Sequence, residues 1–484
     1  MRPVLIFLVL FVASEASAQP PGSRDQGPTP PSTTTSRPAS PPGGSLSGGS
    51  PFLGGVPTGT VTAEPLALTI TEAIGRALQY NLGMLNAEES IGRARGARLR
   101  ERADLMPNLN GRVSETRQEV NLATFGFPLP AGIPAFVGPF NVFDARVYAT
   151  QSVLDLQALN KTRAETHNVA AAQYSYKSAR DVVVLVAANA YLQALAASAR
   201  ADSARAQQQT ADALYRQAGD LRQGGLIAGI DVLRAEVQLS TERQRATAAI
   251  NEFEKAKLQL ARIVGLPIGQ EFTLTDQLPY VPVPEMKLED ALDRAYKTRP
   301  DYQAALERVL AAEAARRAVV DEGLPSVRVN ADFGPVGLTP GDARRTFAVM
   351  GALNVPIFQG GRTNGRLLEA EADLRARKSE AEDLKAGIYY DVRTAFLDLQ
   401  ATEEQLQVAT RGRELAGQQL TQARDRFSAG VADNIEVVQA QEAVTVAAEQ
   451  YIGALYGYNV AKALLARGLG VAEEAVRQYL GGIR

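Results

Sequence analysis

The chain has 484 residues and a nearly balanced charge, and this composition excludes several classes of protein. It contains 51 Lys and Arg against 53 Asp and Glu, so it lacks the strongly basic balance of a nucleic-acid-binding protein. There is no Cys and a single His, His167, which excludes disulfides, iron–sulfur clusters and thiolate zinc sites. We expect no enzyme, no cofactor and no metal site, and we predict that His167, among polar neighbours, lies on a solvated surface.

The first residues have the pattern of an export signal. Arg2 is followed by an apolar run and by small residues that end at Ala18, which predicts a signal peptide over 1–18. This run is too short to cross a bilayer, which takes about 20 apolar residues. Residues 19–64 are rich in Pro, Gly, Ser and Thr, and they are predicted to form a disordered tether because they bury too little apolar surface. No later stretch is expected to form a membrane-spanning helix.

The rest of the chain consists of two copies of one unit. Glu72-Ala73-Ile74 corresponds to Asp290-Ala291-Leu292 at an offset of 218, and Ala190-Tyr191-Leu192 corresponds to Ala395-Phe396-Leu397 at an offset of 205. The first copy therefore contains an insertion, which we place in a loop near its strands. The predicted organisation is a first structural repeat over 65–267, an inter-repeat linker over 268–286, a second repeat over 287–470 and a C-terminal tail over 471–484.

Each copy is predicted to begin with a helix that leads into two strands. The helices cover about 71–105 and 289–323, and the hairpins cover 107–154 and 325–358. Side chains in the hairpins alternate between apolar and polar, as in a strand between lipid and a polar lumen. In the second copy the apolar positions are Val327, Val329, Ala331 and Phe333.

A long helix and a return helix follow each hairpin. The long helices are predicted over 155–224 and 362–429, and Gly225 and Gly430 break them. About 70 residues at 1.5 Å each make a rod of roughly 100 Å. The second rod has a seven-residue apolar repeat, which is typical of paired helices. Its first members are Leu367, Leu374, Ala381, Ile388 and Ala395.

Four strands predict an assembly of several chains. An open sheet cannot sit in hydrocarbon, because every backbone group there needs an internal partner. Two chains would give a small barrel filled by side chains, whereas three would give twelve strands around a passage. We therefore expect an α+β fold, mainly α, in which a homotrimer forms a twelve-stranded barrel in outer-membrane lipid, continued by a periplasmic helical barrel.

The order of these elements resembles the TolC-like outer-membrane efflux proteins. Leu353 to Arg362, with Pro356, Gly360 and Gly361, resembles that family's strand-to-helix junction, and Phe427 to Ala440 resembles its hairpin tip. The resemblance extends from about residue 66 to residue 470. It implies a passive trimeric duct that receives substrates from a periplasmic membrane-fusion adaptor and an inner-membrane pump of the resistance-nodulation-division or ABC type.

Two departures and one alternative accompany this interpretation. The first-copy junction, Gln151 to Asp155, lacks the Pro and Gly-Gly of its counterpart, and the chain has no Cys for a lipid anchor. The alternative is a periplasmic coiled-coil adaptor or scaffold protein without a membrane barrel. Such a protein would share the heptads but would not need paired alternating strands.

Three acids near the helix breaks are candidates for a periplasmic gate: Asp231, Asp433 and Glu436. Such residues are also expected as helix N-caps or first-turn acids, where they interact favourably with the helix dipole. Threefold symmetry would multiply them into acidic rings at the periplasmic mouth, and both roles can hold together. We expect a closed mouth to rest on apolar packing and on Arg424 or Arg426.

Overall fold

The computed structural model describes residues 50–126, 132, 134–225, 227–284, 286–429, 431 and 434–479. The chain separates into two units, Met1–Ser45 and Leu46–Arg484, and all described residues belong to the second. The predicted signal peptide, most of the predicted tether, Gly430 and Asp433 lie outside the described residues.

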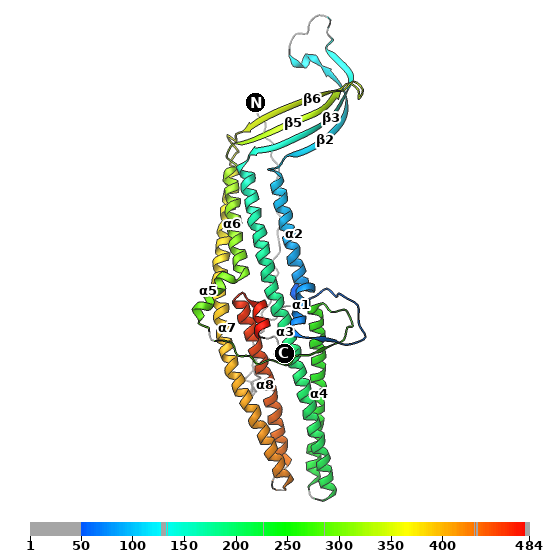
Figure 1. Ribbon diagram of the computed structural model, residues 1–484, viewed down its shortest axis with the longest axis vertical. Helices are drawn as coiled ribbons and strands as arrows, with labels where there is room; N and C mark the ends of the chain where they lie inside the picture. Colours follow the sequence, from blue (N-terminus) through cyan, green and yellow to red (C-terminus); the bar gives the residue numbers. More distant parts are fainter. Residues whose placement is uncertain are drawn as a thin grey trace, which may run out of the picture. The chain divides into compact units, whose positions relative to one another are not determined.

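The two copies contain the same elements in the same order, so the fold is α+β and mainly α, as predicted (Figure 1). The first copy contains α1 (Ile70–Tyr80), α2 (Leu82–Ala103), β2 (Asn108–Asn121), β3 (Phe136–Leu154), α3 (Leu156–Gln223) and α4 (Gly229–Val264). The second contains α5 (Leu288–Thr298), α6 (Pro300–Asp321), β5 (Ser326–Gly337), β6 (Arg344–Asn354), α7 (Arg362–Ser428) and α8 (Asn434–Gly468). The smaller elements are η1 (Pro51–Leu53), β1 (Leu66–Leu68), η2 (Leu122–Phe125), β4 (Phe272–Leu274) and α9 (Ala472–Tyr479).

The helix predicted before each hairpin is in fact two helices, so this expectation was wrong. Asn81 separates α1 from α2, and its side-chain oxygen accepts a hydrogen bond from the Gly83 N–H at 2.9 Å, which caps α2. Pro300 is the first residue of α6, where its missing N–H takes no hydrogen bond from the helix. A capping side chain in the first copy and a proline in the second thus divide a stretch that its alanines and arginines predict to be one continuous helix.

The last residues of the predicted tether contact the rest of the protein, and the predicted linker and tail each contain an element of secondary structure. Residues 50–56 are bonded to the first copy: Leu82 N–H donates to the Gly54 carbonyl at 2.9 Å, and Val56 N–H donates to the Tyr80 carbonyl at 2.8 Å. The predicted linker contains β4, which pairs in parallel with β1. The predicted tail contains α9. Partners distant in the sequence supply the packing that composition alone did not reveal.

The four long strands form an antiparallel sheet in the order β2-β3-β5-β6. One face is polar and carries Arg146, which bonds to Asp144 and Asp332. The alternation predicted from the sequence is therefore present in the pairing register. The opposite face is apolar and exposed, and it includes Leu109, Val113, Val147, Phe333, Phe347, Val349 and Leu353.

The first β-hairpin of this sheet is longer than the second. The last pair between β3 and β5 joins Phe143 to Gly337. Residues 136–142 of β3 therefore pair with β2 alone, and the β2–β3 hairpin extends past the end of β5 and β6 (Figure 1).

The helices continue the order of the strands. Beside the sheet the order is α2-α3-α6-α7, and at the opposite ends of the rods it is α4-α3-α8-α7. One edge of the protomer is therefore formed by β2, α2 and α4, and the other by β6 and α7. The predicted heptad of α7 faces its own chain, because Ala381, Ile388 and Ala395 are buried.

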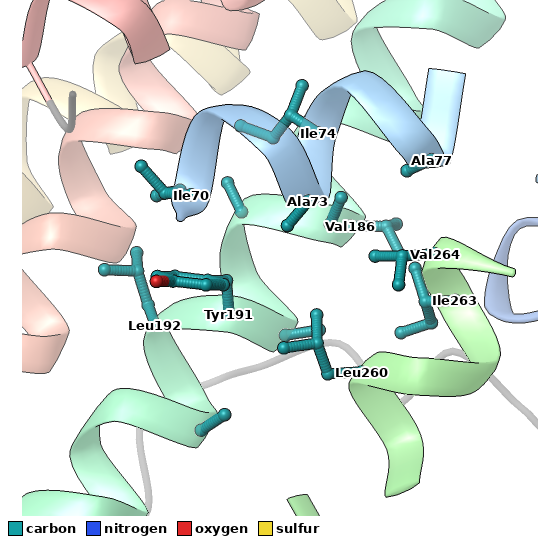
Figure 2. Close-up of a cluster of buried hydrophobic side chains, with 14 of the residues drawn as sticks. Ile70, Ala73, Ile74, Ala77, Val186, Tyr191, Leu192, Leu260, Ile263 and Val264 are labelled. Carbon is teal, nitrogen blue, oxygen red and sulfur yellow. The ribbon is translucent and has the colours of Figure 1, made fainter. Parts of the chain in front are cut away.

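The largest core lies where α1 and α4 pack on α3 (Figure 2). Tyr191 of α3 is fully buried there, and its hydroxyl donates to the Leu68 carbonyl at 2.8 Å. Helix α3 is the one described helix with an 18-residue window long and apolar enough to cross a membrane. Because 67% of that window is buried inside the fold, it has the character of a core helix.

Candidate channel wall and periplasmic mouth

The tip between α3 and α4 is built around a glycine and an acid. Gly225 has a φ of +71°, a left-handed conformation that favours glycine and ends the long helix. Asp231 lies in the first turn of α4, and its carboxylate is 3.1 Å from Arg234. The N-cap is Ala228, so a capping role for Asp231 was wrong, although the acid does lie at the positive end of the helix.

The second tip carries an ion pair that closes the hairpin on itself. Glu436 lies in the first turn of α8, and its carboxylate is 3.3 Å from Nε of Arg426 on α7. Arg426 was expected to support a closed mouth, and in this structure it pairs within its own chain. Both groups are exposed, so the pair contributes at most about 1 kcal/mol. Asp231 and Glu436 are thus each paired with an arginine of their own hairpin.

Above the tips, a charged group joins the two hairpins of one protomer. Arg245 of α4 binds the carboxylate of Glu442 on α8 through two nitrogens, and it also donates to Glu242 at 2.9 Å. Glu242 is fully buried. Burial raises the pKa of Glu242 and the Glu442 charge adds to this effect, while Arg245 opposes it. This group was not predicted from the sequence, although Glu242 interrupts the buried stripe of Ala235, Leu239 and Ala246.

Further polar contacts join α3 to α8. Arg200 is 3.1 Å from Glu449, and the Tyr456 hydroxyl is 2.9 Å from the Asn189 side-chain oxygen. The long helices of the two copies are therefore held together by polar groups as well as by apolar packing.

A buried ion pair lies at the junction of α5 and α6. Arg299 is 5% exposed and bonds to Asp301 at 2.6 Å and to Asp391 of α7 at 2.9 Å.

Burial raises the pKa of Asp181 on α3 to about 6, and the Asp301 charge adds to this effect. Arg467 and Arg180 oppose it, whereas Glu473 adds to it.

His167 is partly exposed, as its polar neighbours predict, but it also has a partner in the fold. Its Nδ1 lies 2.7 Å from a carboxylate oxygen of Glu307, and the contact joins α3 to α6. This partner is 140 residues away in the chain, so the polar sequence around His167 did not reveal it. Among the described residues there is no group of three or more His, Cys, Asp or Glu able to hold a metal ion.

The strand-to-helix junction of the second copy contains two left-handed glycines. Gly360 and Gly361 have φ values of +60° and +83°, and Gly361 is the N-cap of α7. These conformations require glycine even though space for a side chain is open. Before them, Pro356 begins an exposed apolar segment in which Ile357 and Phe358 are 94% and 89% exposed.

Both edges of the protomer carry exposed stripes of small and apolar residues. Within the described residues, β2 pairs only with β3 and β6 pairs only with β5. The spacing of three and four residues places each stripe on one helix face, away from the chain's own core. On α2 the stripe contains Gly92, Gly96, Leu99 and Ala103, and on α7 it contains Gly365, Leu368, Ala372, Ala376 and Ser379.

Comparison with known proteins identifies relatives of the same architecture. A sequence profile described as outer membrane efflux protein matches residues 73–266 and 291–471. Outer membrane protein TolC of Escherichia coli (strain K12) is 25% identical over 362 residues, which cover 69% of this chain and 70% of that protein. The toluene efflux pump outer membrane protein TtgF of Pseudomonas putida is 24% identical over 409 residues, with 79% and 78% covered.

Solved structures share the fold. The outer-membrane channel OprN matches with a TM-score of 0.72 and 19% identity over 83% of this chain and 89% of its own. The CmeC outer membrane channel of Campylobacter jejuni matches with a TM-score of 0.71 and 16% identity over 85% of this chain and 88% of its own.

Proposed function

This chain belongs to the outer membrane efflux protein family, and from that premise we propose that three copies form one passive duct for efflux or secretion. The protein is an outer-membrane channel with a large periplasmic helical portion, and its family consists of transport channels rather than enzymes. Members of the family form trimers and act with adaptors and inner-membrane pumps.

The observation that carries the proposal is the four-stranded sheet with one exposed apolar face. Such a face is stable against lipid, but the outer edges of β2 and β6 must then be paired. A second copy can pair its β6 with β2 of the first, and the same contact brings its α7 stripe against the α2 stripe. Three copies close the ring with twelve strands, which leaves a lumen lined by the polar face.

The position of the helix tips supports a proposal about the partners of the channel. The tips at Gly225 and at the α7–α8 turn are the ends farthest from the sheet, so an elongated periplasmic adaptor would meet the channel there. The pump behind it would be of the resistance-nodulation-division or ABC type. Ile230 lies beside the first tip and is 52% exposed, so a photo-crosslinking residue can replace it. Crosslinking from this position in cells, followed by identification of the attached chains, would separate the two types of pump.

The test of the duct uses purified protein in a non-ionic detergent. Light scattering should give three chains per particle, and planar bilayers should show discrete conductance steps. A folded monomer, or trimers without conductance, would contradict the proposal. A periplasmic adaptor without a barrel, the alternative considered above, would be extracted without detergent.

A further inference from the structure

The polar face of the β-sheet, which lines the proposed lumen, carries an excess of positive charge. In the part of the sheet that all four strands share, the register places two acids and four arginines on this face. Four arginines against two acids leave two net positive charges per copy, and hence six in a trimer. The acids are Asp144 and Asp332, and the arginines are Arg112, Arg146, Arg328 and Arg344.

Both acids of this face bind the same arginine. Asp144 accepts hydrogen bonds from two nitrogens of Arg146, and Asp332 accepts one from the third nitrogen at 3.0 Å. The charge of Arg146 is therefore offset within the sheet. The other three arginines lie on a face whose acids are already bound to Arg146.

The first of these three arginines has an unfavourable neighbour. Arg112 of β2 lies directly opposite Arg146 of β3 in the pairing register. Like charges that face each other on adjacent strands destabilise a sheet. A neutral or acidic residue at this position would favour folding, so the positive charge of Arg112 indicates a role in function rather than in stability.

Assembly into a trimer does not supply a carboxylate for Arg112. Its strand, β2, is at the edge of the sheet, and in the proposed trimer β6 of a second copy pairs with it. The sequence of β6, Arg344–Asn354, contains no Asp or Glu. The strand that covers β2 therefore leaves the charge of Arg112 without an acid in any register. A charge in a passage with low-dielectric walls attracts ions of the opposite sign into it.

The arginines are distributed along the whole shared sheet. Arg328 lies opposite Ser152 near the start of β5, and Arg344 lies opposite Val336 near the other end of that strand. The distance from 328 to 336 is about 26 Å at 3.3 Å per residue. Positive groups at several levels of a passage allow an anion to enter and to move on, because no single site holds it tightly.

We propose that the barrel of this duct passes anionic substrates in preference to cationic ones, and that Arg112, Arg328 and Arg344 select for the negative charge. Such substrates carry carboxylate, phosphate or sulfonate groups. This inference rests on the proposed duct and names the substrate class of its lumen. It concerns the barrel alone, because the acids Asp231 and Glu436 lie at the helix tips, at the opposite end of the molecule.

The test measures block of conductance by a polyanion in planar bilayers that contain the trimer. Inositol hexakisphosphate is added on the external side, from which it reaches the barrel before the helix tips, and it should block the parent. Arg112→Gln combined with Arg328→Gln should raise the blocking concentration at least tenfold. Arg117→Gln is the control: it removes an arginine of β2 from the opposite face of the sheet, where Arg117 pairs with Asn141, and should leave the block unchanged.

The reversal potential in a gradient of KCl gives a second measurement. Arg112→Glu should shift it towards the potential expected for K⁺, whereas Arg117→Glu should leave it at the parent's value. Equal block of the parent and of the double variant would overturn the inference. Trimers that conduct but are not blocked by the polyanion would overturn the inference and leave the duct in place, and trimers without conductance would overturn both.

Discussion

Arg245 on α4 donates two guanidinium hydrogen bonds to Glu442 on α8, with N–O distances of 2.8 and 3.0 Å. The two residues belong to different copies of the duplicated unit, so this contact joins the two helical hairpins, in addition to the contacts of α3 with α8. The same guanidinium offsets the charge of the buried Glu242. Movement of one hairpin against the other must therefore break the bonds to Glu442 or expose Glu242.

Arg245→Met should destabilise the protein more than Glu442→Gln does. Loss of the cation leaves Glu242 buried without its charged partner, which costs about 1–3 kcal/mol, whereas loss of one exposed carboxylate costs at most about 1 kcal/mol. Thermal unfolding of the detergent-solubilised protein measures both. In a protein that already carries Glu242→Gln, Arg245→Met should lower the stability by less, and the loss should approach the one caused by Glu442→Gln. Equal losses in both backgrounds would mean that Arg245 does not stabilise Glu242.

Asp181→Asn should raise stability at neutral pH. Because the folded-state pKa of Asp181 is raised to about 6, the folded protein holds this proton more tightly than the unfolded chain does. Its contribution to stability is full below pH 4 and is lost as the pH rises through about 6. The variant should be more stable than the parent by about 1–2 kcal/mol at pH 7.5 and equal to it at pH 3.5. A constant difference across this range of pH would exclude titration of Asp181 as the cause.

Two neighbouring residues of β5 test which face of the sheet meets lipid. Val329 lies on the apolar face, and Asn330 lies on the polar face. Val329→Arg should block assembly, because an arginine near the bilayer midplane costs roughly 2–4 kcal/mol. Asn330→Arg should assemble as the parent does. Recovery of trimer from outer-membrane extracts gives the comparison, and equal tolerance would place the sheet outside lipid.

The exposed edges of α2 and α7 predict where copies meet. Leu99 of the α2 stripe is 59% exposed, and Val408, farther along α7, is 73% exposed in the isolated protomer. A glutamate at either position would be buried without a partner in the trimer, so Leu99→Glu and Val408→Glu should give folded monomers. Gln407→Glu, which adds the same charge beside Val408, should remain trimeric. Light scattering measures assembly, and circular dichroism measures folding. If Leu99→Glu remains trimeric, Leu99 does not lie in the interface between copies.

The acids of the two tips should bind cations at the periplasmic mouth. Three copies bring six carboxylates from Asp231 and Glu436 towards one opening, so divalent or trivalent metal added on that side should block conductance. Asp231→Asn with Glu436→Gln should abolish the block and keep the trimer. Glu236→Gln is the control: it removes an acid farther from the tip and should leave the block by metal unchanged. Block of the double variant at the parent's metal concentration would leave both acids with a local role at the helix ends.

The architecture was predictable because its signals are local and repeated. A seven-residue apolar period and an alternating strand pattern each describe one face of one element, and the duplication shows each pattern twice. The breaks at Asn81 and Pro300 were missed because one capping side chain and one proline interrupt an otherwise continuous composition. The links from His167 to Glu307 and from Arg245 to Glu442 join residues far apart in the chain, and no local pattern encodes such a pair.

The unequal height of the two β-hairpins has a consequence for the outer surface of the cell. Residues 136–142 pair with β2 alone and rise about 23 Å beyond the shared sheet at 3.3 Å per residue. In a trimer, three such hairpin extensions would surround the external opening. Antibodies and phage would meet these extensions first, and a short peptide tag inserted at Gly132 would be displayed there with the duct below it intact.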